Sequence, residues 1–265
     1  MTTRGLLLSA WDPGLPVSLA CIIALGVYGV RFRRHLEARA VFFGLAVATF
    51  FGALASPVGV LARGYLFSAH MLQHLLLLLA APPLVLLGLP RKRGAPATPP
   101  RHRGPFGYLG PWAAGVGAMW LWHAPALCNL AAVSPTVQTL QIASLLGLGL
   151  AFWRPVLAPC LADRFPPFSA ILYLFAACVA CTILGILVTF SPVEVCSAYV
   201  HPVDSLGILP LLRDGWGLSC RADQEIGGLM MWVPACLVYA CAILATLGRY
   251  YGEERPLPKA VESAS

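Results

Sequence analysis

Long apolar runs separated by short polar connections dominate the chain. The runs lie near residues 15–30, 40–58, 66–89, 108–124, 137–157, 168–190 and 227–248. A bilayer core about 30 Å thick needs a helix of about 20 apolar residues, which pairs its backbone N–H and C=O groups internally. The pattern therefore predicts an all-α polytopic membrane protein, a single bundle of about seven transmembrane helices in a lipid bilayer.

Composition agrees with a membrane protein and excludes several functions. Only 11% of the 265 residues are charged, whereas an ordinary soluble domain has about a quarter. The chain has no P-loop, dinucleotide fingerprint or nucleophile elbow, and only 11 acidic residues, so hydrolytic and phosphoryl chemistry find no support. We expect no enzyme, and no nucleic-acid partner, because the basic residues gather at the ends of apolar runs.

Those basic clusters predict the orientation. Four arginines follow the first run (Arg31, Arg33, Arg34, Arg39), and five basic residues follow the third (Arg91, Lys92, Arg93, Arg101, Arg103). Positively charged loops stay in the cytoplasm, so we expect the N-terminus outside and the C-terminus cytoplasmic. Residues 1–252 would form the transmembrane domain, with a cytoplasmic basic loop at 91–105, a long periplasmic loop at 191–226 that packs as a lid or interfacial helix, and a cytoplasmic tail at 253–265.

Three histidines in apolar runs are candidates for metal binding. His70 and His74 are four residues apart and share one helical face, and the predicted topology brings His123 to the same external level. Met71 lies directly after His70, and Met119 lies four residues before His123. A combination of imidazole and thioether ligands favours copper, especially Cu(I). The alternative is that each histidine bonds a neighbouring helix and each methionine fills a gap in the core.

The cysteines suggest less. Cys178 and Cys181 form a C-x-x-C inside a span, where packing thiols are the expected role. Cys196 and Cys220 share the external loop, where an oxidising periplasm permits a disulfide. Cys128 closely follows His123 and is a candidate extra ligand.

Four motifs carry a resemblance to a known family. They are FSAHMLQHLLLLLAAPPLVLLGLP from Phe67 to Pro90, WLWHAPAL from Trp120 to Leu127, FWRP from Phe152 to Pro155, and DQEIGGLMMWVP from Asp223 to Pro234. Together they resemble the multi-spanning CtaG family of bacterial cytochrome c oxidase assembly factors. The resemblance implies a multi-pass protein of the bacterial inner membrane that helps copper reach a haem-copper oxidase, whose subunits and a periplasmic copper donor would be its partners.

The resemblance also implies site residues. His70 and His74 match the family's third-span motif, His123 its fourth, and Asp223 and Gln224 the opening of its seventh. We therefore predict a metal site from His70, His74, His123, Met71, Met119 and Asp223. Many members open their fifth span with histidines, where this chain has Gln138 and Ile142, so the full ligand set stays open.

Two other functions compete with copper handling. Histidines on two helices can sandwich haem iron, as His74 and His123 would. A metal-free scaffold would instead use the histidines as hydrogen-bonding groups between helices while it holds an oxidase subunit.

Overall fold

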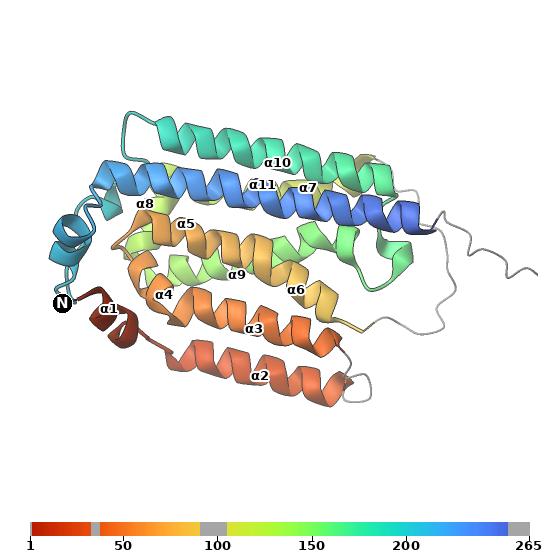
Figure 1. Cartoon of the computed structure of the whole chain (residues 1–265), viewed down its shortest axis with the longest axis horizontal. Helices are drawn as coiled ribbons and strands as arrows, with labels where there is room; N and C mark the ends of the chain where they lie inside the picture. Colours follow the sequence, from red (N-terminus) through yellow and green to blue (C-terminus); the bar gives the residue numbers. More distant parts are fainter. Residues whose placement is uncertain (1, 33–37, 91–104, 254–265) are drawn as a thin grey trace, which may run out of the picture.

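The computed structural model describes residues 2–32, 38–90 and 105–253, and all of their regular elements are helical. The α-helices are α1 (Thr3–Ser9), α2 (Leu15–Phe32), α3 (Arg39–Ala55), α4 (Pro57–Ala62), α5 (Phe67–Leu75), α6 (Ala81–Gly88), α7 (Pro105–Trp122), α8 (Pro125–Val133), α9 (Pro135–Leu157), α10 (Pro167–Phe190) and α11 (Cys220–Glu253). Shorter helical turns lie at Leu76–Ala80 (η2), Leu161–Asp163 (η3), Ser197–Tyr199 (η4) and Leu211–Gly215 (η5). The long helices run alongside one another as a bundle (Figure 1). The predicted basic loop, apart from Pro105, and the tail, apart from Glu253, lie outside the described residues.

Each of the seven predicted apolar segments is helical. Within the described residues, five helices are long and apolar enough to cross a membrane, and six if α7 and α8, bent by 73°, count as one broken span. At 17 residues, α3 is just shorter than those five. The all-α membrane bundle is confirmed, whereas the count of seven spans and the orientation stay predictions.

A proline pair shapes the long helical segment from Phe67 to Gly88. Pro82 has no N–H to donate to the carbonyl of Leu78, four residues earlier. The indole N–H of Trp153, in α9, donates to that carbonyl at 3.1 Å instead, and the π-turn η2 joins α5 to α6. Gly149 of α9 allows the approach, because a Cβ there would lie 2.9 Å from Pro82. The hydrogen bond from Trp153 to the Leu78 carbonyl therefore holds α9 against this span.

Two glycines let α10 and α11 pack closely along their length. A Cβ on Gly185 would lie 2.7 Å from Trp232, and one on Gly228 would lie 2.2 Å from the hydroxyl of Thr189. Small residues of this kind allow close backbone approach in membranes, where packing rather than water exclusion drives helix association. The register of α10 on α11 is therefore set by side-chain size.

One end of the bundle, where α10 ends and α5 and α11 begin, is called the histidine end below. It is covered by residues 191–219, a packed connection that agrees with the expected lid. Ile208 and Leu212 from this connection form a small core with Leu6 of α1 and Leu66. Because α11 begins at Cys220, the connection is shorter than the predicted range 191–226.

A disulfide fastens this lid to the bundle. Cys196 of the lid is bonded to Cys128 of α8, with their Cα atoms 5.8 Å apart. The predicted Cys196–Cys220 bond is therefore wrong, and Cys220 is a free thiol. The sequence could not decide the pairing, because α8 is adjacent to the lid only after the helices have packed. The disulfide also removes Cys128 from the candidate metal ligands.

Candidate metal site

The first turns of α5 place two histidines in the protein interior. His70 and His74 are 2% and 1% exposed, and their ring centroids are 4.3 Å apart, as expected for positions i and i+4 of a helix. His70 also faces Tyr199 of the lid, at 5.5 Å between ring centroids. The prediction that these imidazoles share one face is confirmed.

His123 reaches the same place from the break between α7 and α8. Pro125 cannot continue the hydrogen bonding of α7, and the His123 N–H turns to the carbonyl of Trp120. This leaves the Met119 carbonyl free, and the His123 ring nitrogen Nδ1 lies 2.6 Å from it. The His123 ring centroid lies 5.3 Å from that of His74. Helices α5 and α7 therefore present imidazoles to one another.

The contact with Met119 assigns the proton of His123. A carbonyl oxygen only accepts hydrogen bonds, so Nδ1–H must be the donor, and the other nitrogen, Nε2, carries a lone pair in the neutral ring. This Nε2 lies 2.9 Å from the thioether sulfur of Met71. Two electron-pair donors thus face one another with no proton between them. Such an arrangement suits a cation, and metal-binding histidines commonly donate their other N–H to a carbonyl in this way.

Unpaired polar atoms concentrate around these rings. In the described residues, the buried side-chain N and O atoms without a hydrogen-bond partner belong to Trp112 and to four residues of this region, His70, Gln73, His74 and Gln141. Buried polar groups in proteins are almost always paired, so such a cluster marks a place where a ligand is expected. Gln141 of α9 lies within hydrogen-bonding reach of the His74 ring, but the two side chains do not have the geometry of a hydrogen bond.

Asp223 lies nearby but is fully engaged. Its carboxylate oxygens accept hydrogen bonds from the backbone N–H groups of Phe67 at 2.7 Å and Ser68 at 3.0 Å, and from the Ser68 hydroxyl at 2.5 Å. Leu66, the residue that precedes α5, makes no side-chain cap of its own. Asp223 thus caps the N-terminus of α5 from α11, where unpaired N–H groups and the helix dipole favour a negative charge.

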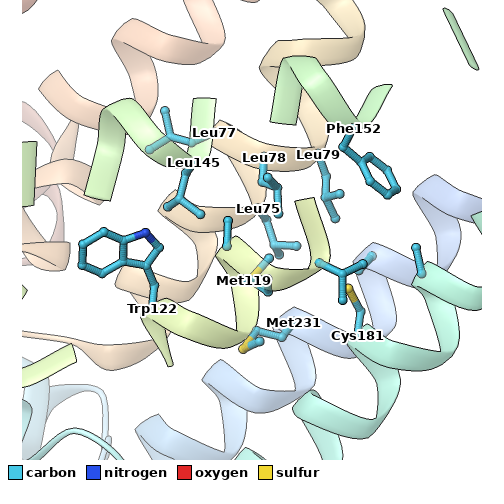
Figure 2. Packing of buried hydrophobic residues seen from close by; sticks show 14 of the residues in the cluster. Leu75, Leu77, Leu78, Leu79, Met119, Trp122, Leu145, Phe152, Cys181 and Met231 are labelled. Atoms are coloured by element: carbon cyan, nitrogen blue, oxygen red, sulfur yellow. The ribbon is translucent and has the colours of Figure 1, made fainter. Parts of the chain in front are cut away.

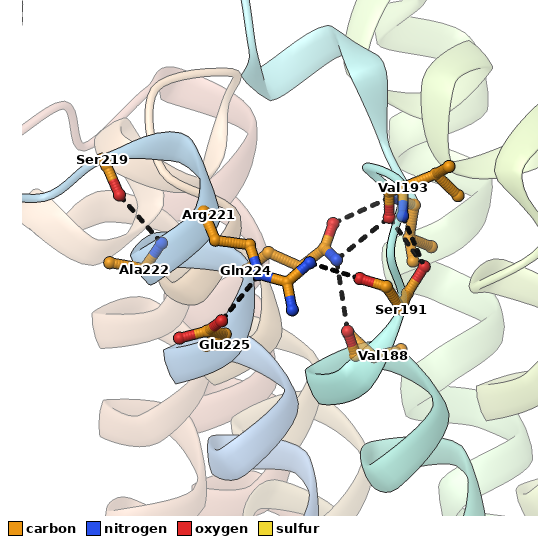
Figure 3. Close-up of polar contacts among 9 residues, drawn as sticks. Val188, Ser191, Val193, Ser219, Arg221, Ala222, Gln224 and Glu225 are labelled. Atoms are coloured by element: carbon orange, nitrogen blue, oxygen red, sulfur yellow. Dashed lines mark hydrogen bonds and ion pairs between the residues drawn. The ribbon is translucent and has the colours of Figure 1, made fainter.

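Gln224 performs the same kind of task toward the lid. Its carbonyl oxygen accepts from the N–H of Val195 at 2.8 Å, and its NH₂ group donates to the carbonyls of Val188 and Val193, each at 3.2 Å (Figure 3). Every polar atom of this buried amide is satisfied. The DQ pair at the start of α11 therefore ties together α5, α10 and the lid.

The structure thus divides the predicted site residues into two groups. His70, His74, His123 and Met71 come together, whereas Asp223 makes the contacts of a helix cap. Met119 meets His123 through its carbonyl, and its side chain lies in the core with Leu75 and Met231 (Figure 2). Across the described ranges, no group of three or more His, Cys, Asp or Glu side chains is arranged to hold a metal ion. A metal bound here would therefore combine imidazole nitrogen with the thioether of Met71.

Gln73 and Gln141 were not among the predicted site residues. The Gln73 amide donates to the carbonyl of Ala53 at 2.9 Å, and its oxygen is unpaired. Both glutamines are polar residues inside apolar runs, and this pattern in the sequence could have marked them as candidate site residues. The family resemblance pointed instead to Gln138 and Ile142, the positions at which many members have histidines.

Comparison with known proteins gives one match. A family model described as cytochrome c oxidase caa3 assembly factor (Caa3_CtaG) matches residues 24–253, which include every residue of the candidate site. No curated protein and no solved structure matches the chain.

Proposed function

Because the chain belongs to the cytochrome c oxidase caa3 assembly factor family, we propose that it carries copper as cargo for a haem-copper oxidase. In this proposal Cu(I) is held between His123 and Met71 and then passed to an oxidase subunit. The site lies at the histidine end, which the basic residues predict to be periplasmic. The Cys128–Cys196 disulfide at that end supports the same side, because disulfides persist in oxidising compartments.

The observation that carries the proposal is the approach of the His123 nitrogen Nε2 to the Met71 sulfur at 2.9 Å. The Met119 carbonyl holds the only proton of the neutral ring on the other nitrogen. A soft cation such as Cu(I) accepts electron pairs from both atoms. Bound copper would therefore stabilise this pair of atoms, whereas without it the two electron-pair donors repel one another.

The surrounding residues suit a carrier rather than a permanent store. His74 and His70 follow along α5, each with both ring nitrogens unpaired, so they offer successive nitrogen ligands toward the lid. As Cu(I) moves from one imidazole to the next, each new copper–nitrogen bond can form while the previous copper–ligand bond breaks. Thioether and imidazole are neutral ligands, so Cu(I) can leave without any protonation of the protein. Release to an oxidase subunit, and loading by a periplasmic copper donor, would both take place through the histidine end.

Copper binding by site variants tests the proposal. The purified wild type is expected to hold Cu(I) here, and the double variant His74→Ala with His123→Ala is expected to lose one equivalent. Met71→Leu keeps the side-chain volume but removes the sulfur, and should lose the copper–sulfur signal of this site in X-ray absorption. His201→Ala, at an exposed position in the lid, is the matched control. Undiminished copper in the double histidine variant would reject the site.

A metal-free scaffold is the second candidate, and one finding favours it. No three metal-ligating His, Cys, Asp or Glu side chains are arranged around an ion within the described segments. Oxidase activity in cells carrying the histidine variants separates the two functions. Loss that added copper reverses supports delivery, whereas full activity supports a scaffold.

A further inference from the structure

Two thiols meet across the interface of α10 and α11, away from the histidines. The Sγ atoms of Cys178 and Cys236 are 3.1 Å apart, and the hydroxyl of Thr182 lies 3.2 Å from the sulfur of Cys236. Cys181, one turn along α10, lies 3.7 Å from the Tyr239 hydroxyl on the inner side. From the sequence, Cys178 was expected only to pack in the core, and a partner thiol on α11 was not predicted.

The helix register places this thiol pair well below the histidine site. A Cβ on Gly227 of α11 would lie 3.1 Å from Met71, so Gly227 marks the level of the copper site. Cys236 is nine residues further along α11, which is about 13 Å at 1.5 Å per residue. The two places are therefore too far apart to share one ion.

Sulfur also occupies the space between them. Met231 lies on α11 between Gly227 and Cys236 and is 1% exposed. It packs in the same core cluster as Met71, Met119 and Cys181, and Figure 2 shows Met231, Met119 and Cys181 in one region between the helices. Buried thioether and thiol groups therefore lie in the same core, between the levels of the two places.

The number and kind of ligands select the metal. Zinc and iron–sulfur sites use four ligands, whereas in the described residues no third His, Cys, Asp or Glu joins Cys178 and Cys236 in a metal-binding arrangement. Thiol and thioether ligands favour Cu(I), which accepts low coordination numbers. We propose that Cys178 and Cys236, both partly buried, form a second Cu(I) site between α10 and α11.

The binding step balances without a change of oxidation state. Cu(I) displaces one proton from the pair, and this proton passes to the base or chelator that delivered the ion. One thiolate and one neutral thiol then share the ion, and the site has no net charge. A neutral site is favoured at this depth, because an uncompensated charge near the middle of the membrane is costly. The Thr182 hydroxyl, 3.2 Å from the Cys236 sulfur, can donate to it and so can stabilise a thiolate at this pair. The identity of the metal rests on the proposed function, whereas the existence of the site does not.

Copper stoichiometry separates the two sites. Cu(I) titration of the full chain in detergent against a competing Cu(I) chelator should show one equivalent fewer for Cys178→Ser with Cys236→Ser than for the wild type. The His74→Ala with His123→Ala variant should keep the thiol-bound equivalent, and its X-ray absorption should show sulfur ligands only. Cys241→Ser, at an exposed position on α11, is the matched control and should bind as the wild type does.

A second measurement does not depend on comparing variants. Cu(I) should protect Cys178 and Cys236 of the wild type from a membrane-permeant maleimide, with Cys241 modified at an unchanged rate, as read by peptide mass spectrometry. Equal copper binding by the cysteine double variant and the wild type, or unprotected Cys178 and Cys236, would overturn the second site. Neither result bears on the histidine site, whose own test uses different residues.

Discussion

Two groups of buried polar residues lie side by side at the histidine end, and they differ in how their hydrogen bonds are used. Asp223 and Gln224 of α11 direct every side-chain oxygen and nitrogen to a protein partner. His70 and His74 of α5 leave all four ring nitrogens unpaired. Both groups are buried and both belong to family motifs. Hydrogen-bond satisfaction, rather than burial, separates residues that hold the fold from residues free to bind a ligand.

The sharpest test of this contrast is Asp223→Ala. It removes three hydrogen bonds at the start of α5, and hydrogen bonds to a charged group and a helix cap together are worth about 3 kcal/mol. We expect the free energy of unfolding, measured by denaturant titration in micelles, to fall by that amount. Asp223→Asn keeps an acceptor oxygen and should recover part of the loss. An unchanged stability in Asp223→Ala would mean that the cap is dispensable.

A smaller loss is expected for Gln224→Leu. The substitution leaves the Val195 N–H without its acceptor, and an orphaned backbone group costs about 2 kcal/mol. Because Gln224 holds residues 193–195, proteolysis of the lid should also become faster. Gln138→Leu, at the start of α9 and outside this network, serves as the control. Equal proteolysis of both variants would contradict the assigned role.

The smallest effect on folding is expected for His74→Leu. Its ring nitrogens make no hydrogen bond, so replacing it with an apolar side chain should change the free energy of unfolding by less than about 0.5 kcal/mol without copper. Copper at 100 times its Kd should stabilise the wild type by about 2.7 kcal/mol. His74→Leu combined with His123→Ala, which removes the proposed copper ligand, should show much less of this stabilisation. A large loss of stability without metal would instead place His74 among the fold-holding residues.

The disulfide extends the comparison to the lid. Cys128 and Cys196 close a sequence separation of 68 residues and fasten the lid beside the candidate metal site, whereas the thiol of Cys220 remains free. The sequence left open a disulfide between the two cysteines that share one loop. The bond forms elsewhere because a disulfide depends on the distance between residues after packing, and the 73° break between α7 and α8 brings Cys128 to the lid.

Periodicity and composition were enough to determine the membrane bundle, because a helix in lipid must pair its own backbone and be apolar along its length. Helical spacing likewise determined that His70 and His74 share a face, and the motifs determined the family. The packed structure alone decided which polar groups are satisfied. Asp223 caps a helix that begins 156 residues earlier, and Cys178 meets Cys236 across 58 residues. Such partners are brought together by tertiary contacts, for which the local sequence carries no signal.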